Sequence, residues 1–130
     1  MENCVFCKII NRQLPGYIIS ENENVIVFVS RHNDPLVVPK KHIKDIYELD
    51  NETGNEITKE LIKTAKAVKK GLESEGVYIT QANEPAAGQD VFHLHFHVYP
   101  RWQDQSKNQV KIVGDEEREQ TMEKVKNAYE

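Results

Sequence analysis

The feature that most constrains this chain is a strict alternation of histidine and apolar residues over positions 93–98, reading His-Leu-His-Phe-His-Val. In a β-strand successive side chains point to opposite faces, so the three imidazoles would share one face while the apolar side chains enter a core. This run holds three of the five histidines of the chain. A row of imidazoles is typical of a metal site or of a site that handles anions and protons. The run therefore predicts a functional strand over residues 93–101.

The size and charge of the chain are those of one ordinary domain. It has 130 residues, 38% hydrophobic and 29% charged, with a formal net charge of −4, so we expect a single domain over residues 1–130. The acidic balance argues against nucleic acid as a partner but allows a local pocket for one phosphate group. No apolar run is long enough to cross a bilayer and the first residues do not resemble a signal peptide. We therefore expect a cytoplasmic protein with a small-molecule partner and no membrane contact.

The remaining pattern predicts a mixed chain of strands and helices. Residues 4–10 have the apolar spacing of a short helix, and a charged helix over 115–129 is expected to pack at the edge. A long amphipathic helix is expected from about residue 53 to residue 75, capped by Asp50 or Asn51 and ended by Gly76. β-branched and aromatic runs predict strands at residues 17–20, 25–29, 36–39, 77–82 and 93–101. The apolar face of the long helix, which packs in the core and in part against a second copy, comprises Ile57, Leu61, Ile62, Ala65, Val68 and Leu72.

Two cysteines, Cys4 and Cys7, have the Cys-x-x-Cys spacing. In a reducing compartment this spacing indicates metal ligation or redox chemistry. A thioredoxin-like redox motif would follow a strand, and nothing precedes this one, which favours a metal. Two thiolates together with His42 and one or more histidines of the 93–97 run form a ligand set that suits tetrahedral zinc. Such a closed site would be structural and would leave the other histidines free.

The loop of residues 83–90 leads directly into the histidine run and contains a Gly-Gln turn. A neutral imidazole can attack phosphorus while loop amides and the Gln89 side chain hydrogen-bond the non-bridging oxygens, and a second imidazole can protonate the leaving group. The pattern therefore predicts nucleophilic catalysis at phosphorus. A competing hypothesis is a catalytic metal held by all three histidines. Alternate strand positions spread the rings along about 13 Å, which disfavours their convergence on one ion.

Four segments together resemble the histidine-triad (HIT) superfamily: residues 4–10, 37–42, 87–89 and 93–101. The resemblance covers about residues 4–101. It implies an α+β, HIT-like fold with an antiparallel five-stranded sheet, one long helix, a short N-terminal helix and a C-terminal helix. It also implies a homodimer paired through the long helix and the neighbouring strand.

The same resemblance implies a nucleotide hydrolase or nucleotidyl transferase acting on nucleoside phosphoramidates or related nucleoside phosphates, with a purine nucleotide or nucleoside phosphate as partner. His95 would form a covalent nucleotidyl intermediate, His97 would contact the phosphate or the leaving group, and His93 would help to hold the nucleophile. Implied phosphate contacts are Asn83, Gly88 and Gln89, implied base-pocket residues are Phe6, Ile9 and Phe28, and implied ligands of a structural zinc ion are Cys4, Cys7, His42 and His93.

The chain departs from the family's usual pattern around residues 30–34. Ser30 stands where an acidic residue usually holds the ribose hydroxyls, and the loop after it is several residues shorter. Asn33 and Asp34 replace a glycine-histidine pair, and Asp90 replaces a serine or threonine. These departures motivate a second hypothesis, in which the chain is a catalytically weak, zinc-stabilised nucleotide-binding or regulatory module.

Overall fold

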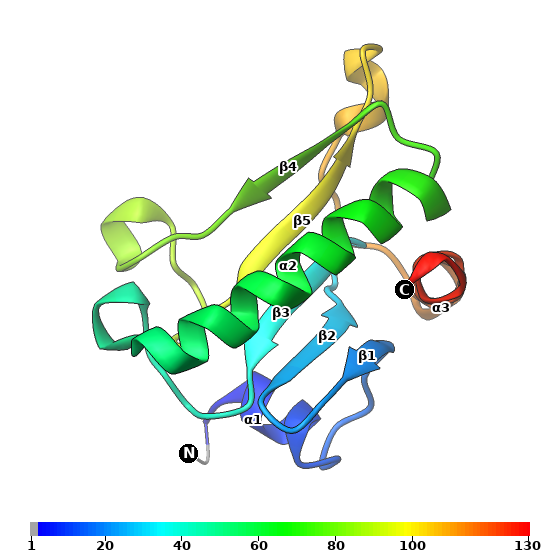
Figure 1. Cartoon of the computed structure of the whole chain (residues 1–130). Helices are drawn as coiled ribbons and strands as arrows, with labels where there is room; N and C mark the ends of the chain where they lie inside the picture. The colour runs from blue at the N-terminus through cyan, green and yellow to red at the C-terminus, as the bar shows by residue number, and fades with distance from the viewer. Residues whose placement is uncertain (1–2) are drawn as a thin grey trace.

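Within residues 3–130, which the computed structural model describes, five antiparallel strands form a sheet of order β1-β2-β3-β5-β4 (Figure 1). The central strands β2 and β3 are buried along their whole length, as expected for their β-branched sequences. The α+β class and the five-stranded antiparallel sheet are therefore confirmed. The strands are β1 (Ile18–Glu21), β2 (Val25–Val29), β3 (Pro35–Pro39), β4 (Gly76–Thr80) and β5 (Phe96–Arg101).

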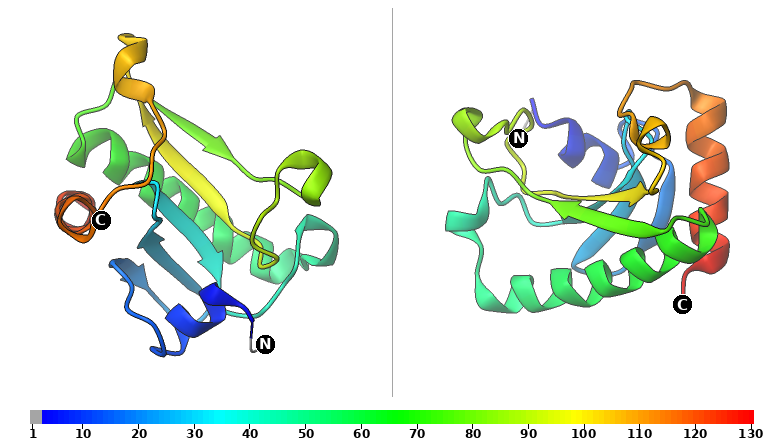
Figure 2. Two further views of the ribbon diagram at one scale, coloured as in Figure 1. Left: turned by 180° about the vertical axis from the view of Figure 1, so that it is seen from behind. Right: turned by 90° about the horizontal axis from the view of Figure 1, so that it is seen from above.

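Helices cover the two faces of the sheet unequally. The long helix α2 (Asn51–Gly71) crosses one face, whereas the short helix α1 (Val5–Ile10) lies against the other (Figure 2). Helix α3 (Asp115–Ala128) packs against α2 and β1 at the side of the molecule (Figure 1). None of the helices within residues 3–130 combines the length and the apolar character needed to span a membrane.

The two ends of α2 differ in how well they were predicted. Asp50 caps the N-terminus, because its carboxylate accepts a hydrogen bond from the Thr53 N–H at 2.7 Å. The C-terminus lies at Gly71, earlier than the predicted residue 75, because Glu73 adopts a left-handed conformation with φ of 54° that turns the chain. Gly71 itself permits a close approach of α3, since a Cβ there would lie 2.5 Å from the Lys124 carbonyl oxygen.

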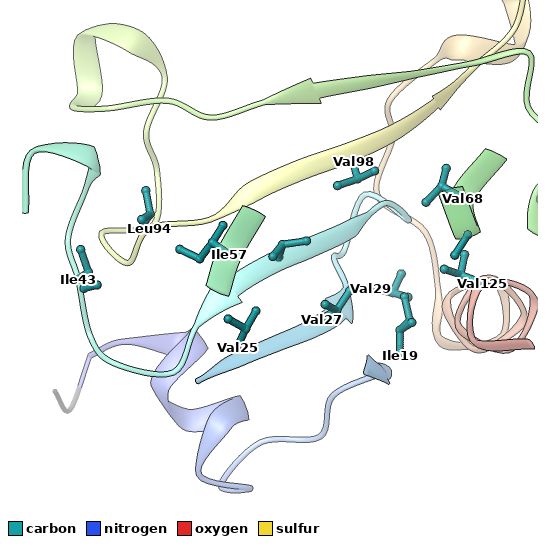
Figure 3. Packing of buried hydrophobic residues seen from close by; sticks show 12 residues of the cluster. Ile19, Val25, Val27, Val29, Ile43, Ile57, Val68, Leu94, Val98 and Val125 are labelled. Atoms are coloured by element: carbon teal, nitrogen blue, oxygen red, sulfur yellow. The ribbon is translucent and has the colours of Figure 1, made fainter. Parts of the chain in front are cut away.

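The larger hydrophobic core lies between α2, α3 and the sheet (Figure 3). Ile57 and Val68 of α2 share this core with Leu94 and Val98, which are buried as predicted, whereas Phe96 is only partly buried against it. The prediction that Ile62 packs in the core with the rest of the apolar face is wrong, because Ile62 is 52% exposed. The buried α2 positions 57, 60, 64, 67 and 68 follow the helical period, and position 62 falls on the opposite side.

A smaller core lies on the α1 face of the sheet. Phe6 and Ile9 of α1 insert among four buried side chains of β2 and β3. The Phe6 and Phe28 rings meet edge to face with their centroids 5.4 Å apart. The strand residues of this core are Ile26, Phe28, Leu36 and Val38.

Candidate functional site

The histidine run lies on the α1 face, but only its last part is a strand. β5 begins at Phe96, and its pairing with β3 starts at the Val37–Phe96 partners. The predicted strand start at residue 93 is therefore wrong: the Leu94 N–H donates to the Ile43 carbonyl, outside the sheet, at 2.7 Å. The imidazoles nevertheless stay together on this face, with the rings of His95 and His97 5.1 Å apart.

At the N-terminal end of the histidine run, two thiols and two imidazoles converge. The ligand atoms of Cys4, Cys7, His42 and His93 all lie within 4.8 Å of one another. His93 Nδ1 is 3.3 Å from Cys4 Sγ and 3.5 Å from Cys7 Sγ, and His42 Nδ1 is 3.2 Å from Cys7 Sγ. A tetrahedral zinc ion with bonds of about 2.1–2.3 Å separates its ligands by roughly 3.5 Å. The four side chains therefore fit zinc, and the structure brings together the set named from the sequence.

The His93 side chain has the protonation pattern of a metal ligand. It is fully buried, and its Nε2–H donates to the Pro39 carbonyl oxygen at 2.8 Å. Because a carbonyl only accepts, the hydrogen of the neutral ring is on Nε2 and the Nδ1 lone pair faces the thiols. Burial lowers the pKa of His93 to about 4, so the ring is neutral at physiological pH.

The Cys-x-x-Cys segment reaches this cluster through the first turn of α1. Cys4 is the N-cap residue, and its Sγ accepts a hydrogen bond from the Cys7 N–H at 3.2 Å. Burial, with further contributions from Cys4, raises the pKa of Cys7 to about 11 in the metal-free chain. A thiol with that pKa keeps its proton at neutral pH, so binding of zinc would release it.

His95 is the middle histidine and is oriented by its own backbone. Its Nδ1–H donates to the His93 carbonyl oxygen at 2.8 Å, which leaves the lone pair on Nε2. Burial lowers the pKa of His95, so neutral pH leaves this nitrogen unprotonated. Only 8% of the residue is exposed, and the Phe6 ring packs edge-on against it at 5.0 Å. The geometry therefore leaves one ring nitrogen of His95, Nε2, with an available lone pair.

His97 has a partner that the sequence analysis did not assign. Its Nδ1 lies 2.8 Å from Oδ2 of Asp34, which is 1% exposed at the start of β3, and Asp34 Oδ1 accepts a hydrogen bond from the Ser30 hydroxyl. On its other side the His97 ring stacks on Tyr99, with 5.1 Å between centroids and 6° between planes. In the sequence Asp34 and Ser30 stand out only as departures from the family pattern, because nothing in the spacing of residues 34 and 97 signals a contact.

The predicted phosphate-binding amides hold the loops of the site. Gln89 is buried; its Oε1 accepts from the Glu84 N–H at 2.7 Å and its Nε2 donates to the Lys44 carbonyl at 2.8 Å. Asn83 Oδ1 accepts from the Ile46 N–H at 2.9 Å. Gly88 has φ of 98°, a conformation that glycine adopts without strain. A contact of these residues with phosphate stays a prediction.

The predicted base-pocket residues take part in the smaller core. Phe6, Ile9 and Phe28 are at most 7% exposed and pack against one another and the sheet. Phe6 also contacts the rings of both His93 and His95. These side chains therefore form the wall beside the histidine row, and a role in holding a base stays a prediction.

Two surface hollows flank the histidine row. One, of about 460 Å³, adjoins the metal cluster and is lined by Cys4, His42, Asp90 and Phe92 among others. The other, of about 490 Å³, lies beyond the opposite end of the row and is lined by Asp34, Tyr99, Arg101 and residues of the segment 107–113.

Comparison with known proteins identifies a family. The chain matches the HIT domain model over residues 11–104. It is 36% identical to Protein hit of Bacillus subtilis over 105 residues, which are 78% of this chain and 72% of that protein. It is 30% identical to the adenosine 5′-monophosphoramidase hnt1 of Schizosaccharomyces pombe over 103 residues, 76% of this chain and 74% of the relative.

Solved structures agree along almost the whole chain. A HIT-like protein from Bartonella henselae has a TM-score of 0.90 at 32% identity and covers 98% of this chain and 97% of its own. A zinc-bound histidine triad family protein from Mycobacterium smegmatis has a TM-score of 0.87 at 30% identity, with coverage of 98% and 93%. A hypothetical histidine triad nucleotide-binding protein from Sulfolobus tokodaii has a TM-score of 0.88 at 30% identity, with coverage of 96% and 91%. The chain therefore belongs to the HIT domain family.

Proposed function

We propose that the chain is a nucleotide hydrolase that releases nucleoside monophosphates from nucleoside phosphoramidates through a covalent nucleotidyl-His95 intermediate. The observation that carries this proposal is the fixed tautomer of His95. Its Nδ1–H is bound to the His93 carbonyl, which leaves the Nε2 lone pair for attack. The likeness to an adenosine 5′-monophosphoramidase and to a nucleotide-binding histidine triad protein supports a nucleotide as substrate.

The proposed reaction has two steps. His95 Nε2 attacks phosphorus, the P–N bond to the amine breaks, and its electron pair goes to the leaving nitrogen. That nitrogen takes the Nε2 proton of a His97 imidazolium, which leaves neutral His97 with its hydrogen on Nδ1. Water then attacks the phosphorus of the intermediate and gives a proton to His97 Nε2, while the electron pair of the P–Nε2 bond returns to His95. The sum is hydrolysis of the phosphoramidate to a nucleoside monophosphate and a free amine.

In this proposal zinc has a structural role. When bound, it would fix the first turn of α1 and the loop bearing His42 to the start of the histidine run through the four ligands. All four positions of a tetrahedral ion would be filled by protein, which leaves none for a substrate. The zinc-bound relative from Mycobacterium smegmatis and the close approach of the four side chains support the metal assignment.

We further propose a homodimer formed through β4 and α2. β4 pairs with β5 on one side, and within the described residues its other edge is open. Ile79 and Tyr78 of β4 are 45% and 53% exposed, and Ile62 of α2 is exposed as well. Apolar side chains on an open strand edge and the adjacent helix are typical of an interface.

The direct test of the catalytic proposal compares wild-type protein with His95→Ala on adenosine 5′-phosphoramidate, measuring release of AMP. The variant should lose at least about 1000-fold in kcat, the order expected when a covalent catalyst is removed. Glu123→Ala is the control, because its side chain is exposed on α3 outside the histidine row, and it should keep full activity. Equal rates for wild type and His95→Ala would refute the mechanism.

A catalytically weak binding module is the second candidate. Its support is the close packing of Phe6, Ile9 and Phe28, which leaves the predicted base positions filled by the chain itself. In that case calorimetry would detect AMP binding to wild-type protein, while turnover of adenosine 5′-phosphoramidate would equal that of His95→Ala. The same pair of proteins therefore separates the two functions.

A further inference from the structure

A buried carboxylate, that of Asp34, contacts the ring of His97, the last histidine of the row. Asp34 is 1% exposed and is the last residue of the β2–β3 connection, with Oδ2 2.8 Å from His97 Nδ1. A carboxylate in such a place is costly unless hydrogen bonds satisfy it. The Ser30 hydroxyl and the His97 ring supply them, one to each oxygen.

The β2–β3 connection is tight and fixes this carboxylate. The Ser30 N–H donates to the Asp34 carbonyl at 2.8 Å, and the Asn33 N–H donates to the Ser30 carbonyl at 3.0 Å. Asn33 has φ of 68°, a left-handed conformation that asparagine tolerates in turns. Asp34 is therefore held by backbone bonds on a rigid hairpin, not by a mobile loop.

The His97 ring is consequently fixed from two directions. An ionised carboxylate only accepts hydrogen bonds, so the Asp34 contact keeps a hydrogen on Nδ1 and leaves Nε2 for the reacting groups. Tyr99 stacks in parallel on the ring and limits its rotation. When Nε2 takes a proton, the positive charge of the ring lies beside the carboxylate.

We propose that Asp34 is a positioning residue for proton transfer by His97, with Ser30 as its support. This proposal rests on the proposed function. Asp34 keeps His97 Nε2 as the atom that gives a proton to the leaving nitrogen in the first step and accepts one from water in the second. Asp34 does not touch the substrate, and its own carboxylate gains and loses no proton. In many sites an aspartate fixes a histidine tautomer in this way, and loss of its charge reverses the tautomer.

The substitution Asp34→Asn tests this role with little change in shape. Since one oxygen accepts the Ser30 hydroxyl, the amide NH₂ would face His97 Nδ1 and favour a hydrogen on Nε2 instead. The measurement is single-turnover release of two leaving groups from AMP: an alkylamine, which needs a proton, and p-nitrophenolate, which leaves as a stable anion. Asp34→Asn should slow amine release about 100-fold, the low end of general acid catalysis, and p-nitrophenolate release less than about 5-fold.

Two further variants separate positioning from charge and from folding. Asp90→Asn removes an exposed carboxylate at the same site, and it should change both release rates by the same factor. Ser30→Ala keeps the Asp34–His97 contact and removes the hydroxyl that donates to Asp34 and accepts from the His32 N–H. It should give the same selectivity for the amine, with a smaller decrease in rate. Equal slowing of both leaving groups by Asp34→Asn would overturn the proposal in favour of a structural role.

A readout that needs no turnover distinguishes failure of this proposal from failure of the proposed function. In ¹⁵N-histidine NMR at a pH where the His97 ring is neutral, wild-type His97 should carry its hydrogen on Nδ1, and Asp34→Asn should move that hydrogen toward Nε2 while the His95 signals stay unchanged. Failure of the hydrolase proposal would appear as an inactive wild type with this tautomer shift intact. An unchanged His97 tautomer in Asp34→Asn, with unfolding temperature near wild type, would overturn the positioning role.

Discussion

The two faces of the sheet are stabilised by different means. The α2 face is covered by a helix of 21 residues, with the 14-residue α3 packed beside it, and is filled with aliphatic side chains. The α1 face carries a helix of 6 residues and the histidine row, whose members are tied to one another, to carbonyl oxygens and to one carboxylate. One face is thus a hydrophobic core, and the other is a network of polar contacts with a small core beside it.

This difference follows from how the same run of residues serves both faces. Leu94 and Val98 enter the α2-face core, while the histidines between them face α1. Packing of Leu94 and Val98 on one face therefore fixes the backbone that carries the imidazoles of the other face. A helix as short as α1 is marginal by itself, so its place depends on Phe6, Ile9 and the four candidate zinc ligands.

Metal removal should have the largest effect, and it should act on the α1 face. A ligand present at about 1000 times its Kd stabilises the folded state by about 4 kcal/mol, so chelation of a bound zinc ion should lower stability by that order. Metal analysis should find one zinc ion per chain, and Cys7→Ser and His42→Ala should lose it. An unchanged unfolding temperature after chelation would show that packing alone holds α1.

Hydrogen exchange would sharpen the same comparison. After chelation, the amides of α1 should exchange faster, because that helix loses its ligands, while those of α2 keep their protection. Equal loss of protection on both faces would mean that the two faces unfold as one unit.

A pair of core truncations should produce the next largest effects. Ile57→Ala on α2 and Phe6→Ala on α1 each remove a buried side chain and should each lower stability by about 3 kcal/mol. Assayed well below the unfolding temperature, Ile57→Ala should keep wild-type turnover, whereas Phe6→Ala should lose it, because Phe6 packs on His95. Equal activity of the two variants would break the functional distinction between the faces.

Sequence alone predicted the parts of this structure that depend on periodicity and on ligand chemistry. The alternation predicted that Leu94 and Val98 are buried. Ligand chemistry predicted a metal cluster of Cys4, Cys7, His42 and a histidine of the run, and the resemblance specified that histidine as His93. The sequence did not predict the contact of Asp34 with His97, because a hydrogen bond between residues 63 positions apart leaves no local pattern. The sequence also predicted that α2 runs to about residue 75 and is ended by Gly76. It could not predict the earlier end, because glutamate is not a residue type that signals the left-handed conformation adopted by Glu73.

Charged residues introduced at the open edge of β4 and on the adjacent α2 should prevent dimer formation. Their effect on the stability of the fold should be smaller than that of the core truncations. Ile79→Lys combined with Ile62→Glu replaces exposed apolar side chains of β4 and α2, so each monomer should keep its unfolding temperature to within a few degrees. Light scattering should show a dimer for wild type and a monomer for the double variant. A double substitution on the exposed part of α3, Lys124→Glu with Glu117→Lys, should leave the dimer intact. A wild type that is monomeric at high concentration would contradict the proposed interface.

The smallest expected effect concerns the ribose. Ser30 and Asp34 are both buried and are hydrogen-bonded to each other, and Asp34 is engaged with His97, so this corner of the α1 face offers no free carboxylate to a ribose diol. The kcat/KM values of adenosine and 2′-deoxyadenosine 5′-phosphoramidates should therefore agree to within about 3-fold, less than the roughly 1 kcal/mol of one net hydrogen bond. A preference of about 100-fold for the ribose compound would show that another group holds the diol.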